Sequence, residues 1–312
     1  MNANTPAVRA HADCTVRFAA AKIGTEQASN GLRVALPVLA GAAEACLLED
    51  ASGPMLADGW TLYRAGACLA GFATAASGAD LERATDELYQ RLFALTAGLH
   101  LYRVWNYVPH INALTRGVEA YHGFCSGRSR AFEREFGSEF QRVLPAASAV
   151  GSHGGPLSVA FLAGSAPPQH FENPAQTPAF KYPVQYGPRP PSFSRATAVT
   201  LGPERHVFIS GTSAIRGHAS LAVGSFDGQL GYTLENLALI RDTAGAGELT
   251  GGSSSWRRAL KVFLRRPEDL RPARVRLERD LLRDGDTVSY LNADICRSNL
   301  LVEIEETLVS GA

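Results

Sequence analysis

The chain has 312 residues, of which 46% are apolar and 19% are charged. A chain of this length forms one large domain or two ordinary ones, and its apolar content allows a substantial core and excludes extensive disorder. Thirty basic and thirty acidic residues cancel, and no strongly basic block occurs, so we expect no nucleic acid partner.

The five cysteines are widely spaced and form no CxxC pair. This pattern argues against a disulfide framework or a zinc site and fits a reducing cytoplasm. The N-terminus lacks a charged region followed by an apolar one, and no apolar run is long enough to span a membrane. We therefore expect a cytoplasmic protein with neither a signal peptide nor a membrane partner.

The N-terminal half predicts strands followed by an alternation of helices and strands. The first twenty residues, which are polar and rich in alanine, are expected to be partly frayed. The first helix is indicated by apolar residues at three- and four-residue steps from Leu81 to Leu95. The expected elements are strands at 33–39 and 44–48, a helix over 79–98, a strand over 101–108 and a second helix around 116–136.

A domain boundary is expected near Leu144 and Pro145, before a strand-rich block over 145–164. The proline-rich loop that follows, 165–195, is long for a compact domain, which favours a functional role. The remaining expected elements are strands at 207–211, 259–264, 286–295 and 299–306, and helices over 229–243 and 267–283.

The order of these elements forms a weak internal repeat. Residues 80–136 and 229–283 each contain a helix, a strand and a second helix. Helices that return to one sheet predict an α/β (α+β) fold of two halves, in which each mixed sheet carries its helices on one face. We therefore expect an N-terminal domain over 1–144 and a C-terminal domain over 145–312.

One segment rich in chemistry is the proline-stiffened loop 181–195. It carries Tyr182, Tyr186, Arg189 and Arg195. Guanidinium forks match planar carboxylates, and tyrosines can hydrogen-bond a ligand or cover its ring. The loop therefore predicts a site for a small anion, although surface arginines and packing tyrosines would give the same pattern.

The turn at Gly211, Thr212 and Ser213 adds a second candidate for anion binding. Backbone N–H groups and hydroxyls at such a turn can point toward an anion. The motif is common in proteins, so alone it gives little specificity.

A second segment rich in chemistry, 295–305, places Cys296 and Glu303 on or beside an apolar strand. Apolar neighbours raise the pKa of a carboxyl group, which would suit Glu303 to donate a proton. Strand alternation puts Glu305 on the same face, so the pattern does not choose between the two glutamates. Cys296 either shapes the pocket or is a small buried hydrophobe, as free cysteines usually are.

Parts of the chain resemble a known superfamily. The segments 208–213, 233–237 and 301–305 are similar to the YjgF/RidA proteins. From about Leu101 to Glu305 the chain resembles, more specifically, the chorismatases within that superfamily. The segments that carry this resemblance are 102–109, 182–197, 210–218 and 295–303.

The resemblance implies an enzyme that needs no metal or organic cofactor and releases pyruvate from chorismate. It implies that Glu303 is the acid/base and that residues of the loop and the turn bind the substrate. Cys296 places the chain with the branch that forms 3-hydroxybenzoate, in some members together with 4-hydroxybenzoate. The other branch hydrolyses the ether to a dihydroxycyclohexadiene carboxylate.

Two other classes of protein stay open. Imine deaminases of the superfamily carry an arginine upstream of the strand glutamate, near the position of Val288, and its absence here counts against deamination. A non-catalytic ligand-binding module would also retain an arginine pair. Because YjgF-like domains often form trimers, we expect either a monomer with a pseudo-repeat or a homotrimer.

Overall fold

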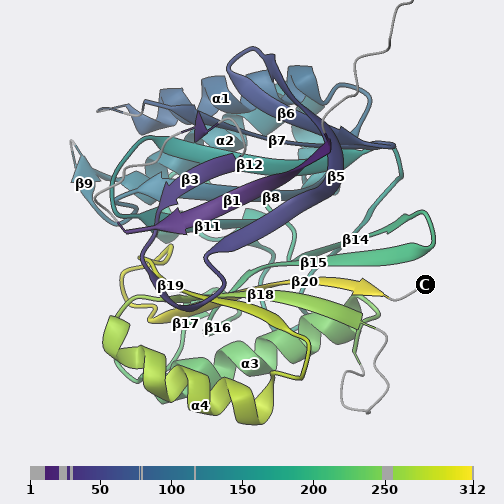
Figure 1. Cartoon of the computed structure of the whole chain (residues 1–312). Helices are drawn as coiled ribbons and strands as arrows, with labels where there is room; N and C mark the ends of the chain where they lie inside the picture. The colour runs from purple at the N-terminus through teal and green to yellow at the C-terminus, as the bar shows by residue number, and fades with distance from the viewer. Residues whose placement is uncertain are drawn as a thin grey trace, which may run out of the picture.

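The computed structural model describes residues 11–20, 27–28, 31–76, 78, 80–115, 117–247 and 256–310. These residues form four layers, with one helix pair above two facing sheets and a second pair below them (Figure 1). The helices are α1 (Leu81–Leu95), α2 (Ala120–Phe136), α3 (Phe226–Thr243) and α4 (Leu270–Asp280). In the described part of the chain, no helix combines the length and the apolar character that crossing a membrane requires.

The first sheet has nine strands and the second has seven. The first runs in the order β11 (Ala146–Ser152), β8 (His100–Pro109), β12 (Leu157–Gly164), β7 (Cys68–Ala75), β6 (Trp60–Ala65), β5 (Glu44–Ala57), β1 (His11–Ala19), β3 (Gly31–Ala35) and β2 (Gln27–Ala28). The second runs in the order β13 (Gln169–Phe171), β14 (Ala196–Leu201), β15 (Glu204–Thr212), β20 (Val302–Ser310), β18 (Trp256–Leu264), β19 (Thr287–Asn292) and β4 (Val38–Gly41).

Short elements lie in the connections between the main strands and helices. They are the hairpins β9 (Leu114–Thr115) with β10 (Val118–Glu119) and β16 (Ile215–Arg216) with β17 (Ala219–Ser220), and the 3-10 turns η2 (Gly137–Val143), η3 (Ala179–Lys181), η4 (Val184–Tyr186) and η5 (Pro267–Asp269). The predicted long loop therefore contains β13 and two of these turns.

The predicted repeat is confirmed by the strand order. In the first sheet β8 and β11 are parallel and joined through α2, and β12 pairs antiparallel with β8. In the second sheet β18 and β19 are parallel and joined through α4, and β20 pairs antiparallel with β18. Each half thus contains the same crossover unit, with its helices on one face of its sheet. The assembly state stays a prediction.

The apolar residues of the described chain form three large cores that match the layers, and a small fourth cluster of Ala214, Ile215, Ile295 and Leu300. One cluster joins α1 and α2 to the first sheet, and another joins α3 and α4 to the second sheet. Between them, a third cluster contains residues of both sheets, including Phe72, Trp105 and Phe208. The helix α1 begins as its sequence predicts, because the Asp80 carboxylate accepts a hydrogen bond from the Arg83 N–H and caps the first turn.

Three parts of the fold differ from the expected arrangement. The strand β1 lies inside the first sheet between β3 and β5, so residues 11–19 are not frayed. The block 145–164 also belongs to the first sheet, and the chain leaves that sheet for the second only between Gly164 and Gln169. Residues 38–41 pair with β19 in the second sheet. The division into domains 1–144 and 145–312 stays a prediction, but the sheets do not change at 144.

Truncation of Phe72 should test how far the packing between the sheets stabilises the fold. Its ring is fully buried in the central core and leans against Tyr63. We expect Phe72→Ala to lower the free energy of unfolding by about 3–5 kcal/mol through lost burial and the cavity left behind. Urea unfolding followed by fluorescence measures this change. Val275→Ala, at a position 60% exposed on α4, should change stability little.

Candidate active site

A cavity of about 470 Å³ lies where the two sheets meet the predicted loop. Its wall is formed by α2, the edge strand β11, the loop before β14, the end of β15, the loop after β19 and Glu303 on β20. A cavity of this size and mixed polarity suits a small organic ligand.

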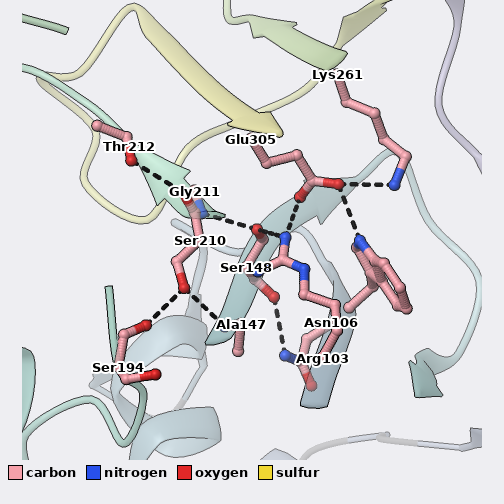
Figure 2. A network of polar contacts seen from close by, with 11 residues as sticks. Arg103, Asn106, Ala147, Ser148, Ser194, Ser210, Gly211, Thr212, Lys261 and Glu305 are labelled. Atoms are coloured by element: carbon pink, nitrogen blue, oxygen red, sulfur yellow. Dashed lines mark hydrogen bonds and ion pairs between the residues drawn. The ribbon is translucent and has the colours of Figure 1, made fainter. Parts of the chain in front are cut away.

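The edge strand β11 is held against the second sheet by hydroxyl groups. The Ala147 N–H donates to Ser210 Oγ at 2.8 Å, and that hydroxyl donates to the Ser194 carbonyl oxygen at 2.6 Å. The Gly211 N–H donates to Ser148 Oγ at 2.9 Å (Figure 2). These bonds satisfy backbone groups that an edge strand would otherwise leave unpaired, and they fix the cavity wall.

Glu303 faces the cavity from β20 and is only 4% exposed. Its Oε1 has no hydrogen-bond partner among the described residues. Burial, reinforced by the nearby Glu305, raises the pKa of Glu303 to about 8. The carboxyl group is therefore protonated at neutral pH and is suited to give up a proton.

Gly211 makes room for this carboxyl group. A Cβ atom at residue 211 would lie 2.0 Å from Glu303 Oε1, far inside van der Waals contact. The expected turn is wrong at residues 211 and 212, which lie within β15, and the glycine at position 211 is required by close packing against Glu303. Ser213 also lines the cavity, and its Oγ donates to the Val302 carbonyl oxygen at 2.9 Å.

Glu305 lies on the same face of β20 as Glu303, but it is fully paired. Lys261 Nζ lies 2.6 Å from Oε1, Arg103 Nη2 lies 2.7 Å from Oε2, and Trp105 Nε1 donates to Oε1 at 2.9 Å (Figure 2). Burial alone would raise the pKa of Glu305, but Lys261 and Arg103 outweigh it and lower this pKa to about 2. The structure thus separates two glutamates that the sequence left equivalent.

Three arginines line the cavity, and each keeps a buried nitrogen without a hydrogen-bond partner among the described residues. Arg128 comes from α2, Arg195 precedes β14, and Arg297 follows Cys296. The Arg128 guanidinium lies over the rings of Tyr89 and Phe132, at 5.2 and 5.6 Å from their centroids. Unsatisfied guanidinium groups around one cavity define a site for an anion.

The two predicted tyrosines both line the cavity and position these arginines. Arg195 Nη2 donates to Tyr182 Oη at 2.7 Å. The Arg297 guanidinium stacks over Tyr186 at 3.9 Å from the ring centroid. Tyr186 Oη also lies 3.2 Å from His218 Nδ1. The loop therefore presents aromatic faces together with cations.

Cys296 lines the same cavity as Glu303. Burial raises the pKa of the Cys296 thiol to about 12, and Glu303 adds to this shift against the opposing effect of neighbouring arginines. The side chain is thus a neutral thiol at physiological pH. It can shape the cavity or form weak hydrogen bonds, whereas a thiolate nucleophile is disfavoured.

The loop that carries Cys296 and Arg297 is fastened by one partly buried side chain, Arg265. Arg265 donates to the carbonyl oxygens of Leu300 at 2.7 Å, Arg297 at 3.0 Å and Ile295 at 3.2 Å. It also pairs with Asp294, and it reaches Asn112 Oδ1 on the other half of the molecule at 3.0 Å.

Two predicted site residues lie outside the cavity wall. Arg189 Nη1 pairs with Glu133 Oε2 at 2.6 Å on the surface of α2, and Thr212 Oγ1 donates to the Ser210 carbonyl oxygen at 2.9 Å. Several lining residues escaped prediction. They include Arg128 and Arg297, together with Glu119, Tyr121 and His122. Arg297 stands next to Cys296 in a segment already singled out, whereas nothing in the helical pattern marked Arg128.

A two-sheet α/β fold that encloses an arginine-lined cavity with a neutral carboxyl group defines a site for a small anion. Residues 53–163, most of the first sheet, match the family described as "Chorismatase FkbO/Hyg5-like, N-terminal". The chorismatase of Streptomyces rapamycinicus is 36% identical over 263 residues, which cover 80% of this chain and 76% of that protein. The chain belongs to the chorismatase family.

Another relative and one crystal structure agree with this assignment. The 3-hydroxybenzoate synthase of Streptomyces hygroscopicus is 40% identical over 214 residues, which cover 66% of this chain and 62% of that protein, so less than two thirds of its length is matched. A crystal structure of a chorismatase superposes with a TM-score of 0.82 at 29% identity and covers 98% of this chain and 96% of the other. RidA from an Antarctic Psychrobacter covers 45% of this chain, with a TM-score of 0.34 and 19% identity.

Removal of the Arg265 guanidinium should loosen the Cys296 loop. We expect Arg265→Met to accelerate amide hydrogen exchange in residues 294–301 by about tenfold or more. Loss of these hydrogen bonds lowers the free energy needed to open the loop, and a decrease of about 1.4 kcal/mol makes exchange tenfold faster. Exchange followed by mass spectrometry measures this effect. Arg257→Met, which removes an exposed pair with Glu204, is the matched control. Equal protection of the loop in both variants would contradict the role given to Arg265.

Proposed function

We propose that this protein is a chorismatase that converts chorismate to pyruvate and 3-hydroxybenzoate, with 4-hydroxybenzoate as an alternative ring product. The observation that carries the proposal is the cavity itself. A carboxyl group that keeps its proton shares this cavity with three guanidinium groups, each of which has a buried nitrogen without a hydrogen-bond partner among the described residues. The names of the relatives at 36–40% identity support the same activity.

The charges of the cavity match those of chorismate. The substrate carries two carboxylates, and Arg128, Arg195 and Arg297 offer buried donors for two anionic groups. Tyr182 and Tyr186 provide faces against which a flat ring can pack. Gly211 and Ser213, which the sequence predicted as site residues, line the same cavity as the proposed acid Glu303.

Glu303 supplies the proton that starts the reaction. Its carboxyl proton passes to the terminal methylene carbon of the enolpyruvyl ether, which becomes an oxocarbenium ion. The ring C–O bond then breaks, its electron pair moves to the oxygen that becomes the pyruvate carbonyl, and the ring carbon becomes electrophilic. The Glu303 carboxylate left behind can take a proton back in a later step, so it acts as acid and then as base.

The fate of the ring decides the product. If the neighbouring ring hydroxyl attacks the electrophilic carbon and loses its proton, an epoxide forms. The bond between the epoxide oxygen and the carbon that first carried it then breaks and the oxygen gains a proton. The carbon that now carries the oxygen loses its hydrogen as a proton, and 3-hydroxybenzoate forms without any added atom. If water attacks instead, a dihydroxycyclohexadiene carboxylate forms. The neutral thiol of Cys296 lies in the cavity wall with Glu303, and we propose that it favours the internal displacement by excluding water.

Glu303→Gln tests the proton donor. The amide keeps the shape of the side chain but cannot donate the proton, so we expect turnover to fall by about 10²–10⁴-fold while chorismate still binds. Pyruvate release measured by coupled assay, and binding measured by calorimetry, separate the two effects. Activity close to that of the wild type would move the acid role away from Glu303.

The pH dependence tests the same role in the unaltered protein. Glu303 holds its proton below about pH 8 and loses it above, so kcat/KM for pyruvate release should fall as the pH rises through about 8. This alkaline limb should be absent from the residual activity of Glu303→Gln. A profile that instead rises through this range would contradict a protonated acid in the resting protein.

Cys296→Ala tests the control of the product. We expect pyruvate release to continue while the ring product shifts toward the dihydroxy acid, because the smaller side chain admits water. Chromatography of the ring products after incubation with chorismate measures the ratio. An unchanged mixture of ring products would show that Cys296 only packs against its neighbours. Binding of chorismate by the wild type without any pyruvate would instead indicate a ligand-binding module.

A further inference from the structure

We propose that Glu305 is a positioning residue for the acid: its carboxylate, held by Lys261, Arg103 and Trp105, keeps the proton on Glu303. The inference rests on the proposed function, which gives Glu303 the role of proton donor. Glu305 does not line the cavity wall formed by the described residues, so it would act on the reaction only through Glu303.

The first step of the argument is the register between β20 and β18. Glu303 and Glu305 lie two residues apart and therefore point to the same side of the sheet, toward the first sheet. The residue opposite Glu305 is Lys261, whereas the residue opposite Glu303 is Phe263. Cross-strand neighbours are the closest side chains on a sheet face, so one carboxyl group meets a cation and the other meets an apolar ring.

The second step is the number of donors around Glu305. Its two oxygens receive three charged or polar donors, from Lys261, Arg103 and Trp105. A buried carboxylate with this many donors remains ionised at every physiological pH. Two carboxyl groups on one strand face cannot both ionise easily in a buried site, so the fixed charge of Glu305 disfavours ionisation of Glu303.

The third step concerns the two buried cations. Arg103 is 1% exposed and Lys261 is 8% exposed, and both pair with Glu305, whose single negative charge balances one of the two positive charges. If Glu305 lost its charge, Glu303 would be the nearest buried carboxyl group on that strand face, and it would ionise to serve as their counterion. Glu305 thus acts in two ways. Its negative charge disfavours ionisation of Glu303, and it pairs with the cations that would otherwise stabilise an ionised Glu303.

The groups that face Glu303 from the other elements do not replace Glu305 in this role. Arg103 and Arg195 favour the charged form of Glu303, and the neutral Cys296 and Tyr121 do not stabilise a negative charge. Among these groups Glu305 alone carries a negative charge. The network in Figure 2 also connects Glu305 and Arg103 to the cavity wall. Arg103 Nη2 donates to Ser148 Oγ, and the same oxygen accepts a hydrogen bond from the Gly211 N–H.

The test reads the proton on Glu303 directly. The full-length protein labelled with 13C at the glutamate carboxyl carbon is titrated by NMR, and Glu303→Gln assigns the signal. In the wild type we expect Glu303 to titrate near pH 8. In Glu305→Gln the midpoint should fall by more than about one pH unit, as expected for directly coupled carboxyl groups. An unchanged midpoint in Glu305→Gln would overturn the inference.

Glu306 provides a matched control on the same strand. It is also a buried glutamate, and it pairs with Arg241 at 2.7 and 2.8 Å, but it points to the opposite face of β20, toward α3. Glu306→Gln removes a buried charge and an ion pair at similar cost to the fold, yet the Glu303 midpoint should stay unchanged. Equal shifts in both variants would show a general structural effect and reject a specific role for Glu305.

Two further measurements keep the outcome decisive. If Glu305→Gln does not fold, Lys261→Met with Glu305→Gln removes one charge of each sign, and the Glu303 midpoint should still fall. With chorismate as substrate, the alkaline limb of kcat/KM should move to lower pH in the same variants by the same amount. If the wild type releases no pyruvate, the proposed function fails, while the NMR titration still decides whether Glu305 holds the proton on Glu303.

Discussion

The ion pair between Glu305 and Lys261, extended across the sheet interface to Arg103, is the interaction on which the site depends. The two sheets pack through a mainly apolar core, where an isolated charge would be strongly unfavourable. Glu305 and Lys261 pair within the second sheet, whereas Arg103 comes from the first, so Arg103 meets its counterion only when the halves are correctly aligned. A buried cluster of this kind contributes more to alignment than to net stability.

The cluster lies beside the cavity and is bonded to its wall. Arg103 reaches Ser148 on β11, and Ser148 accepts the N–H of Gly211 on β15 (Figure 2). Gly211 in turn leaves the space that the Glu303 carboxyl group occupies. Alignment of the sheets, the position of the cavity wall and the environment of the acid are therefore set by one continuous group of contacts.

Much of the fold and part of the site could be predicted from the sequence. The four helices and the repeat were predicted, the first helix from its apolar periodicity, and the strand carrying Glu303 was recognised by its apolar neighbours. The choice between Glu303 and Glu305 depends on cross-strand register, which places Phe263 or Lys261 opposite each one. Arg128 could not be predicted because it lies within a helix whose buried face is set by tertiary contacts. The pairing of residues 38–41 with the second sheet also depends on contacts between residues far apart in the sequence.

An arginine-lined cavity favours ionisation of the acid within it, and the buried carboxylate of Glu305 opposes this effect. Guanidinium groups that attract a dianion also stabilise the ionised carboxylate of the proton donor. An acid placed among Arg128, Arg195 and Arg297 would therefore tend to lose its proton before the ligand arrives. A bound dianion would cancel these cations, but only after binding. In the empty protein, burial is the largest factor that keeps the proton on Glu303, and a fixed negative charge adds to it. Glu305 supplies this charge from behind the cavity wall, where it does not compete with the ligand for the arginines.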